Sequence, residues 1–229
     1  MGSGFQAFSQ DGSNVVQIDG DAGVPNLGLL TKYTVVTTSV YASSPGGSST
    51  ATDVLSLAGA VNPIVALYCV GAVGRAATLL WMDGTNFQVV CNGPVGTTIE
   101  IYIFGKPTDS GQKCFQVFDA SGNLVFDAGR APMRVRGQWA PSALGALGTL
   151  PAGPKYAAVV TSGSSRTYQA AGPTNYIRYD LRPGVHLAGG SLNQIELYGV
   201  VVDYEPITAA GTSYGMNNAH VLILDVTGL

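Results

Sequence analysis

The segment Gly211-Thr-Ser213-Tyr-Gly215 fits the G-x-S-x-G pattern of a serine nucleophile. That elbow requires a strand before the serine and a helix after it, so that the hydroxyl is lifted towards oxyanion donors. Here the residues up to His220 lead into another apolar run, and no acid and histidine follow at the spacing that a triad needs. We therefore interpret the segment as a loop between two strands, and we expect no enzyme of this class.

Metal and cofactor chemistry also lacks its usual residue patterns. His186 and His220 are the only histidines, and no second histidine or cysteine lies near either of them at metal-ligand spacing. Asp19-Gly-Asp21 lacks the spacing of an EF-hand and reads as a solvated turn. Gly71-Ala-Val-Gly74 lacks the three-glycine spacing of a dinucleotide loop. The sequence predicts no metal and no cofactor.

Three cysteines, Cys69, Cys91 and Cys114, contain no C-x-x-C pair. Such residues are usually buried reduced thiols that pack as small apolar groups, which is the interpretation that we favour. A disulfide between Cys69 and Cys91 stays open. Reduced thiols are typical of a protein made in a bacterial cytoplasm, and with Lys32 as the first basic residue we expect no signal peptide.

Two carboxylates could support glycan hydrolysis, which needs a pair about 5 to 10 Å apart. Glu100 and Glu196 lie in similar stretches, Ile99-Glu-Ile-Tyr102 and Ile195-Glu-Leu-Tyr198. Period-two alternation explains both as outward-facing residues beside inward aliphatic ones.

Two further groups of residues could form contacts with other proteins. A dense basic group reads as a solvated edge or an intersubunit salt-bridge face, and tyrosines supply contact area with a polar end. The interface candidates are Arg130, Arg134, Arg136, Tyr168, Tyr176, Tyr179 and Tyr204.

The elements that must position these residues are predicted to be strands. Of 229 residues, 31 are glycine, 46% are hydrophobic and 11% are charged, with a net charge of -3. This composition excludes a coiled coil and gives no electrostatic reason for nucleic-acid binding. Hairpins are predicted at 78–91, around Asp83-Gly84, and at 115–126. Further strands are expected at 97–104, 156–161, 176–181, 194–204 and 220–226.

Three segments stand apart from the strands. The stretch 42–51 reads as a Ser/Gly loop, and 143–154 reads as a linker or an ordered small-residue segment. Ser142 to Leu150 is a weak helix candidate. No apolar run is long enough to span a bilayer.

Parts of the sequence repeat. Phe5-Gln-Ala-Phe8 with Val16-Gln-Ile-Asp19 resembles Phe115-Gln-Val-Phe118 with Val125-Phe-Asp127, and the two glutamate stretches form a second echo in the same order. Either the chain is an internal duplication of two β halves, or hairpins simply favour such residues. We expect an all-β protein of one or two β-sandwich-like domains, divided into 1–107 and 108–229.

The same segments carry a family resemblance. Phe5 to Asp19, Ile99 to Pro107 and Phe115 to Asp127 resemble the opening F-x-x-F…Q-I-D and the V-[FY]-D-A-x-G-x-[LV]-[VL]-F-D pattern of small virion proteins of tailed bacteriophages. The resemblance covers the first 137 residues. It implies a structural protein of the tail, near its tip, and it implies no catalysis.

We therefore expect a virion protein that assembles with symmetry mates, as a trimer or higher ring, and with neighbouring tail proteins. Low charge fits this, because charged residues are depleted in interface cores. Three alternatives remain. The first is a receptor-binding module for a host surface glycan or pilus, with contact loops at 162–175 or 208–218. The second is a capsid decoration protein, and the third is a polysaccharide hydrolase.

Overall fold

The computed structural model describes residues 6–8, 16–19, 27–44, 47–70, 74–112, 115–119, 121–141, 143, 145, 147–151, 154–170, 176–188, 194–209, 211 and 214–229. These residues form strands, turns and irregular connections and no helix, so the predicted all-β class is confirmed. It follows that the described part of the chain contains no helix that could cross a membrane.

The strands follow one another along the chain with short connections. In order, they are β1 (Gln6–Phe8), β2 (Val16–Asp19), β3 (Gly28–Val36), β4 (Ser39–Ser44), β5 (Gly47–Ala51), β6 (Leu55–Ser56), β7 (Ile64–Cys69), β8 (Ala77–Met82), β9 (Asn86–Cys91), β10 (Thr98–Gly105), β11 (Gln116–Phe118), β12 (Leu124–Asp127), β13 (Arg134–Trp139), β14 (Leu147–Thr149), β15 (Tyr156–Ala170), β16 (Tyr176–Ala188), β17 (Gln194–Ile207) and β18 (Tyr214–Asp225). The predicted hairpins β8–β9 and β11–β12 are confirmed.

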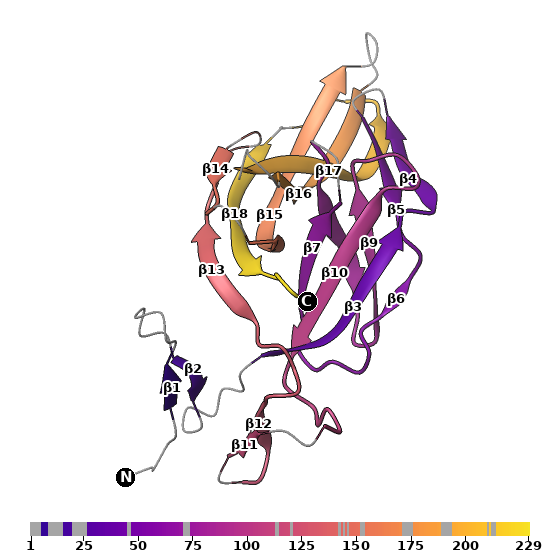
Figure 1. The fold of residues 1–229 in the computed structure, drawn as a ribbon. Helices are drawn as coiled ribbons and strands as arrows, with labels where there is room; N and C mark the ends of the chain where they lie inside the picture. Colours follow the sequence, from indigo (N-terminus) through magenta and orange to yellow (C-terminus); the bar gives the residue numbers. More distant parts are fainter. Residues whose placement is uncertain are drawn as a thin grey trace.

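The main body is a sandwich of two antiparallel sheets of six and eight strands. The six-stranded sheet has the order β3-β10-β7-β15-β18-β13. The eight-stranded sheet has the order β4-β5-β9-β8-β16-β17-β14, with β6 also paired to β9. The far ends of β15 and β16 pair with each other and so join the two sheets (Figure 1).

The two halves of the body repeat one pairing pattern. β10 pairs with β3 and β7 in the first half, as β18 pairs with β13 and β15 in the second. In the other sheet, β9 pairs with β5 and β8, as β17 pairs with β14 and β16. Equivalent strands meet at the boundary between the halves, where β7 pairs with β15 and β8 with β16. The halves are therefore related by a local two-fold axis.

Three contacts between the halves lie at this axis. Each joins positions that are equivalent in the two halves. They are Gly28 with Pro132, Leu67 with Ala158, and Ala77 with Val185. Gly184 lies beside the last of these contacts. A Cβ on Gly184 would lie 2.7 Å from Val200 and 3.0 Å from Ala76, so only glycine lets β16 pack this closely there.

Each half has its own core between the sheets. The first core includes Phe87, Ile99 and Ile101, and the second includes Leu197 and Ile223, all nearly inaccessible to solvent. A third cluster covers the outer face of the six-stranded sheet where the halves meet. Since both sheets run through both halves, the division into domains at residue 107 stays a prediction.

Two small hairpins, β1–β2 and β11–β12, lie beyond one end of the sandwich (Figure 1). Their registers match residue for residue. Gln6 pairs with Asp19 and Phe8 with Val16, as Gln116 pairs with Asp127 and Phe118 with Leu124, with the same irregularity before the last pair. The first sequence echo is therefore a structural repeat.

Some expectations from the sequence were wrong. The stretch 42–51 is not a loop over its described residues, since 42–44 belong to β4 and 47–51 form β5, and the two strands pair. Leu147–Thr149 is strand β14 instead of part of a helix. The proposed contact loops at 162–175 and 208–218 include residues of β15 and β18, and their remaining residues 171–175, 210, 212 and 213 lie outside the described part of the chain.

Candidate functional site

The arginines predicted as an interface group are bound within the chain. Arg136 forms an ion pair with Asp225 at 2.8 Å, and Arg134 lies 3.7 Å from the same carboxylate while donating to the Thr227 carbonyl at 2.6 Å. Burial raises the pKa of Asp225, but the hydrogen bonds from Thr227 and Arg136 outweigh it and lower the pKa below its ordinary value. These two arginines thus fasten the edge strand β13 to β18, and a further role at an interface stays a prediction.

The four candidate tyrosines lie on the long strands β15, β16 and β17, but their side chains are outside what the structure describes. The backbone register places Tyr179 opposite Tyr204, Tyr176 opposite Ile207 and Tyr168 opposite Arg178. The sheet therefore brings these positions to one end of the molecule, opposite the small hairpins (Figure 1).

The two glutamates do not form a hydrolytic pair. Glu100 lies on the six-stranded sheet and Glu196 on the eight-stranded sheet, and their strand neighbours Ile99 and Leu197 point into the core. Because side chains alternate along a strand, both carboxylates face outwards, on opposite sides of the sandwich. The hydrolase alternative therefore loses the residues on which it depended.

Glu100 instead anchors a polar cluster on the outer face. Its carboxylate accepts hydrogen bonds from Lys155 at 2.6 Å and from the Tyr102 hydroxyl, and Lys32 lies 3.7 Å away. Burial raises the pKa of Glu100, but the hydrogen bonds and the two ammonium groups outweigh it and lower the pKa. Burial and the bond to Glu100 raise the pKa of Tyr102. The cluster therefore connects β3, β10 and the residue before β15 on the outer face of the six-stranded sheet.

The two histidines have different neighbours in the described part of the chain. His186 is buried with Nδ1 3.2 Å from the Arg75 carbonyl, and His220 lies 3.2 Å from the Gln138 amide. Over the described residues, no three His, Cys, Asp or Glu side chains come together as metal ligands do.

A different surface is formed at the base of hairpin β11–β12. Asp127, only 2% exposed, is the residue that organises it. Its carboxylate accepts hydrogen bonds from the Gly129 amide at 2.7 Å, the Ser110 amide at 2.8 Å and the Gln116 side chain at 3.3 Å. Asp127 thus ties together β11, the turn after β12 and the segment that enters the hairpin. The repeat in the sequence has the same residue types, Gln6 and Asp19, at the equivalent backbone positions.

The hairpin carries aromatic side chains that face solvent. Phe115 is 56% exposed and Phe118 is 53% exposed, whereas Val125 on the neighbouring strand β12 is buried. The Phe115 ring lies 6.2 Å from the Phe126 ring, in a tilted pair. Phe115 directly precedes β11 and Phe118 ends it, and exposed aromatic side chains supply apolar area of the kind that protein interfaces use.

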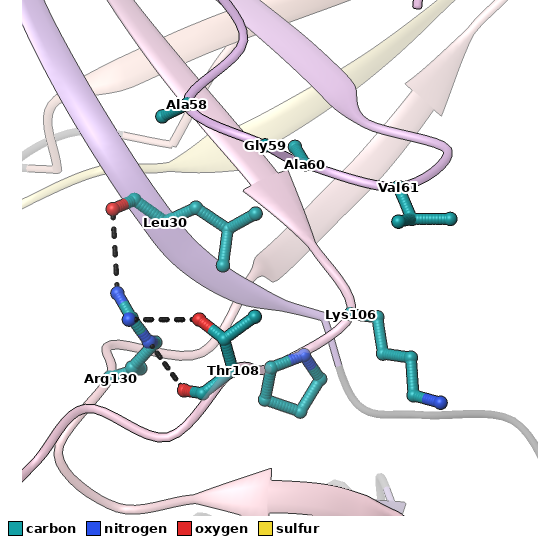
Figure 2. A pocket seen from close by; sticks show the side chains of 9 residues that line it. Leu30, Ala58, Gly59, Ala60, Val61, Lys106, Thr108 and Arg130 are labelled. Atoms are coloured by element: carbon teal, nitrogen blue, oxygen red, sulfur yellow. Dashed lines mark hydrogen bonds between the residues drawn. The ribbon is translucent and has the colours of Figure 1, made fainter.

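A pocket of about 250 Å³ opens where this hairpin joins the body (Figure 2). One wall is Arg130, whose guanidinium donates to the Thr108 carbonyl at 2.9 Å, the Thr108 hydroxyl at 3.0 Å and the Leu30 carbonyl at 3.4 Å. The opposite wall is the turn 58–61, which ends in Val61 at 67% exposure, and Lys106 lines the rim. Arg130 therefore fixes the pocket wall and does not project from the surface.

This surface was not predicted from the sequence. One signal was present, because Phe115-Gln-Val-Phe118 places apolar side chains on both faces of a very short strand, which a strand with one buried face does not need. The pocket could not be foreseen, since its walls come from segments far apart in the sequence.

Comparisons with known proteins add no assignment. No family model matches the chain, and searches of curated proteins and of solved structures found no match. The fold alone defines the class, an all-β sandwich protein with two appended hairpins.

Proposed function

We propose that this protein is a structural component of a bacteriophage tail, near the tail tip, and that it docks on neighbouring tail proteins through the end that carries hairpin β11–β12. The segments that carry the resemblance to phage virion proteins are the ones that build β10 and the two hairpins. The sandwich serves as a rigid body that holds the docking end in place.

The observation that carries the proposal is the exposure of Phe115 and Phe118. A two-stranded hairpin on its own is marginally stable in water, so an appended hairpin gains stability when a partner covers its exposed apolar side chains. Burial of one phenylalanine side chain contributes about 1.5 to 3 kcal/mol. Val61 is a further exposed apolar side chain, beside the pocket, and the low charged fraction of 11% agrees with a chain that is covered in an assembly. We expect copies to be arranged as a trimer or higher ring.

The test replaces both exposed rings with serine, Phe115→Ser and Phe118→Ser, in the phage genome. The variant protein should fold, since neither ring belongs to a buried cluster, but purified particles should contain at least tenfold less of it than wild type. Leu147→Ser is the matched control because Leu147 is also exposed, at 62%, on β14 at the far side of the body (Figure 1). Normal incorporation of the double variant would contradict the docking role.

The same particles distinguish the alternatives. Antibody labelling of intact particles should mark the tail, whereas labelling of the head would support a capsid decoration protein. A receptor-binding module would bind host cells as the isolated protein, through the opposite end formed by β15 to β18. We expect no such binding.

A further inference from the structure

Two thiols face each other across the sandwich in the first half of the molecule. Cys69 lies at the end of β7 in the six-stranded sheet, and Cys91 lies at the end of β9 in the eight-stranded sheet. Their Sγ atoms are 3.8 Å apart, and the side chains are 6% and 0% exposed within the first core.

The second half fills the same place with aliphatic side chains. Leu67 and Ala158 are equivalent positions of β7 and β15. Cys69 lies two residues after Leu67 and Val160 lies two residues after Ala158, so Val160 is the counterpart of Cys69. Ala77 and Val185 are also equivalent positions. Ala77 pairs with Cys91 and Val185 pairs with Leu197, so Leu197 is the counterpart of Cys91. The fold is therefore served by apolar residues at this place, and the thiols supply chemistry that the core does not require.

The surroundings of the two sulfur atoms are unequal. The Gly93 amide donates to Cys91 Sγ at 3.2 Å. The hydrogen bond from the Cys69 thiol lowers the pKa of Cys91. The Gly93 amide and the Arg75 charge also lower it, and burial raises it but is outweighed. The same hydrogen bond and burial raise the pKa of Cys69. Cys91 is thus the better nucleophile, and Cys69 is placed to resolve an oxidised Cys91.

We propose that Cys69 and Cys91 form a disulfide that links the two sheets once the chain leaves the reducing cytoplasm and meets a small oxidant such as hydrogen peroxide. The Cys91 thiolate attacks the peroxide, breaks its O–O bond and becomes a sulfenic acid with release of hydroxide. The Cys69 sulfur then attacks Cys91 Sγ, the S–S bond forms, and the sulfenic oxygen leaves as water with the thiol proton. The two thiols lose two electrons, and the peroxide is reduced to two waters.

A disulfide has an S–S distance of about 2.05 Å, so the two Sγ atoms, now 3.8 Å apart, must approach one another when the bond closes. The bond closes a loop between residues 22 apart in the chain. It constrains the unfolded chain, so the oxidised protein should be the more stable form.

The experiment uses the full chain. Reduced protein is treated with a small excess of hydrogen peroxide, denatured, alkylated and analysed by peptide mass mapping, and its melting temperature is compared before and after treatment. We expect a linked pair of peptides containing Cys69 and Cys91, a free Cys114, and a melting temperature several degrees higher that returns to its starting value with dithiothreitol. Cys114→Ser should behave in the same way, whereas Cys69→Ser and Cys91→Ser should abolish both changes.

Recovery of Cys69 and Cys91 as alkylated thiols, or as sulfinic acids, from oxidised wild-type protein would overturn the proposal. This readout comes from the wild-type chain and so does not depend on whether the serine variants fold. It is also independent of the docking function, since it needs no tail protein.

Discussion

At the scale of single residues, the same Glu-x-Tyr pair occurs twice and serves the same purpose each time. The Tyr102 hydroxyl donates to Glu100, and the Tyr198 hydroxyl donates to Glu196 at 2.9 Å. Residues two apart on a strand share a face, so this bond forms wherever the pair lies on an outer face. The second sequence echo therefore reports local chemistry, because the counterpart of β10 in the second half is β18 and not β17.

The Glu100 cluster should make a measurable contribution to stability. Glu100→Gln leaves Lys155 and Lys32 without their carboxylate, and the Glu100 side chain is only 13% exposed. We expect the free energy of unfolding at pH 7 to fall by about 1 to 2 kcal/mol, with allowance for solvent screening at the partly exposed lysines, as measured by urea denaturation. Glu196→Gln is the matched control, and it should cost less because the contacts described for Glu196 include a tyrosine but no ammonium group.

The stabilisation by Glu100 should depend on pH in the direction that its pKa shift sets. The pKa of Glu100 is lower in the folded protein than its ordinary value, so the unfolded chain binds more protons as the solution is acidified. The stabilisation is complete above the unfolded pKa, about 4.3, and is lost as the pH falls through the folded pKa. The difference between wild type and Glu100→Gln should therefore shrink between about pH 5 and pH 3. A difference that stays constant over this range would show that the carboxylate charge does not stabilise the fold.

At the scale of elements, strands with strong turn chemistry could be predicted and strands of small polar residues could not. Asp83 accepts amide hydrogen bonds from Thr85 at 2.7 Å and Asn86 at 2.6 Å, which is the turn that Asp-Gly signals. In β5, by contrast, the buried Ser49 and Thr50 hydroxyls donate to the Val201 carbonyl at 2.7 Å and the Gly93 carbonyl at 2.9 Å. Their partners lie far away in the sequence, so a local pattern reads this strand as a loop.

Hairpin β11–β12 should depend on the Asp127 carboxylate. Asp127→Ala removes the carboxylate that accepts from the part-buried amides of Ser110 and Gly129, at a cost of about 1 kcal/mol for each hydrogen bond. We expect amide hydrogen exchange over residues 108–130 to accelerate at least tenfold, while exchange in β10 stays slow. Asp119→Asn at the tip of the same hairpin is the control, because asparagine retains the turn bonds to Ser121 and Asn123. Equal exchange in both variants would mean that the base of the hairpin is held by other contacts.

At the scale of the whole molecule, the sequence indicates two halves but cannot show how they meet. The hairpin repeat marks where each half begins, and its register is conserved in the structure. The strands of the body share an alternating pattern that does not distinguish one strand from another, and the halves differ in the lengths of β15 to β18. Their equivalence becomes visible only through the pairing at the local two-fold axis, where the Leu29 amide donates to Ala131 at 2.7 Å and the Met133 amide to Leu27 at 2.8 Å.

This symmetry predicts that the order of the halves in the chain can be exchanged. Equivalent positions of β10 and β18 make Leu229 the counterpart of Pro107, and the repeat makes Phe5 the counterpart of Phe115. In the order of the chain, a linker from Leu229 to the first hairpin would therefore take the place of the natural stretch from Pro107 to the second hairpin. A circular permutant that starts at Thr108, ends at Pro107 and joins the old termini by a short Gly/Ser linker should fold, with the far-ultraviolet circular dichroism and elution volume of the wild type.

A control permutant opened between Ile101 and Tyr102 breaks a fully buried strand and should not fold, because the pairing with β3 and β7 is interrupted. If both permutants aggregate while the wild type stays soluble, the halves are not interchangeable, and the equivalence would be one of strand pairing alone.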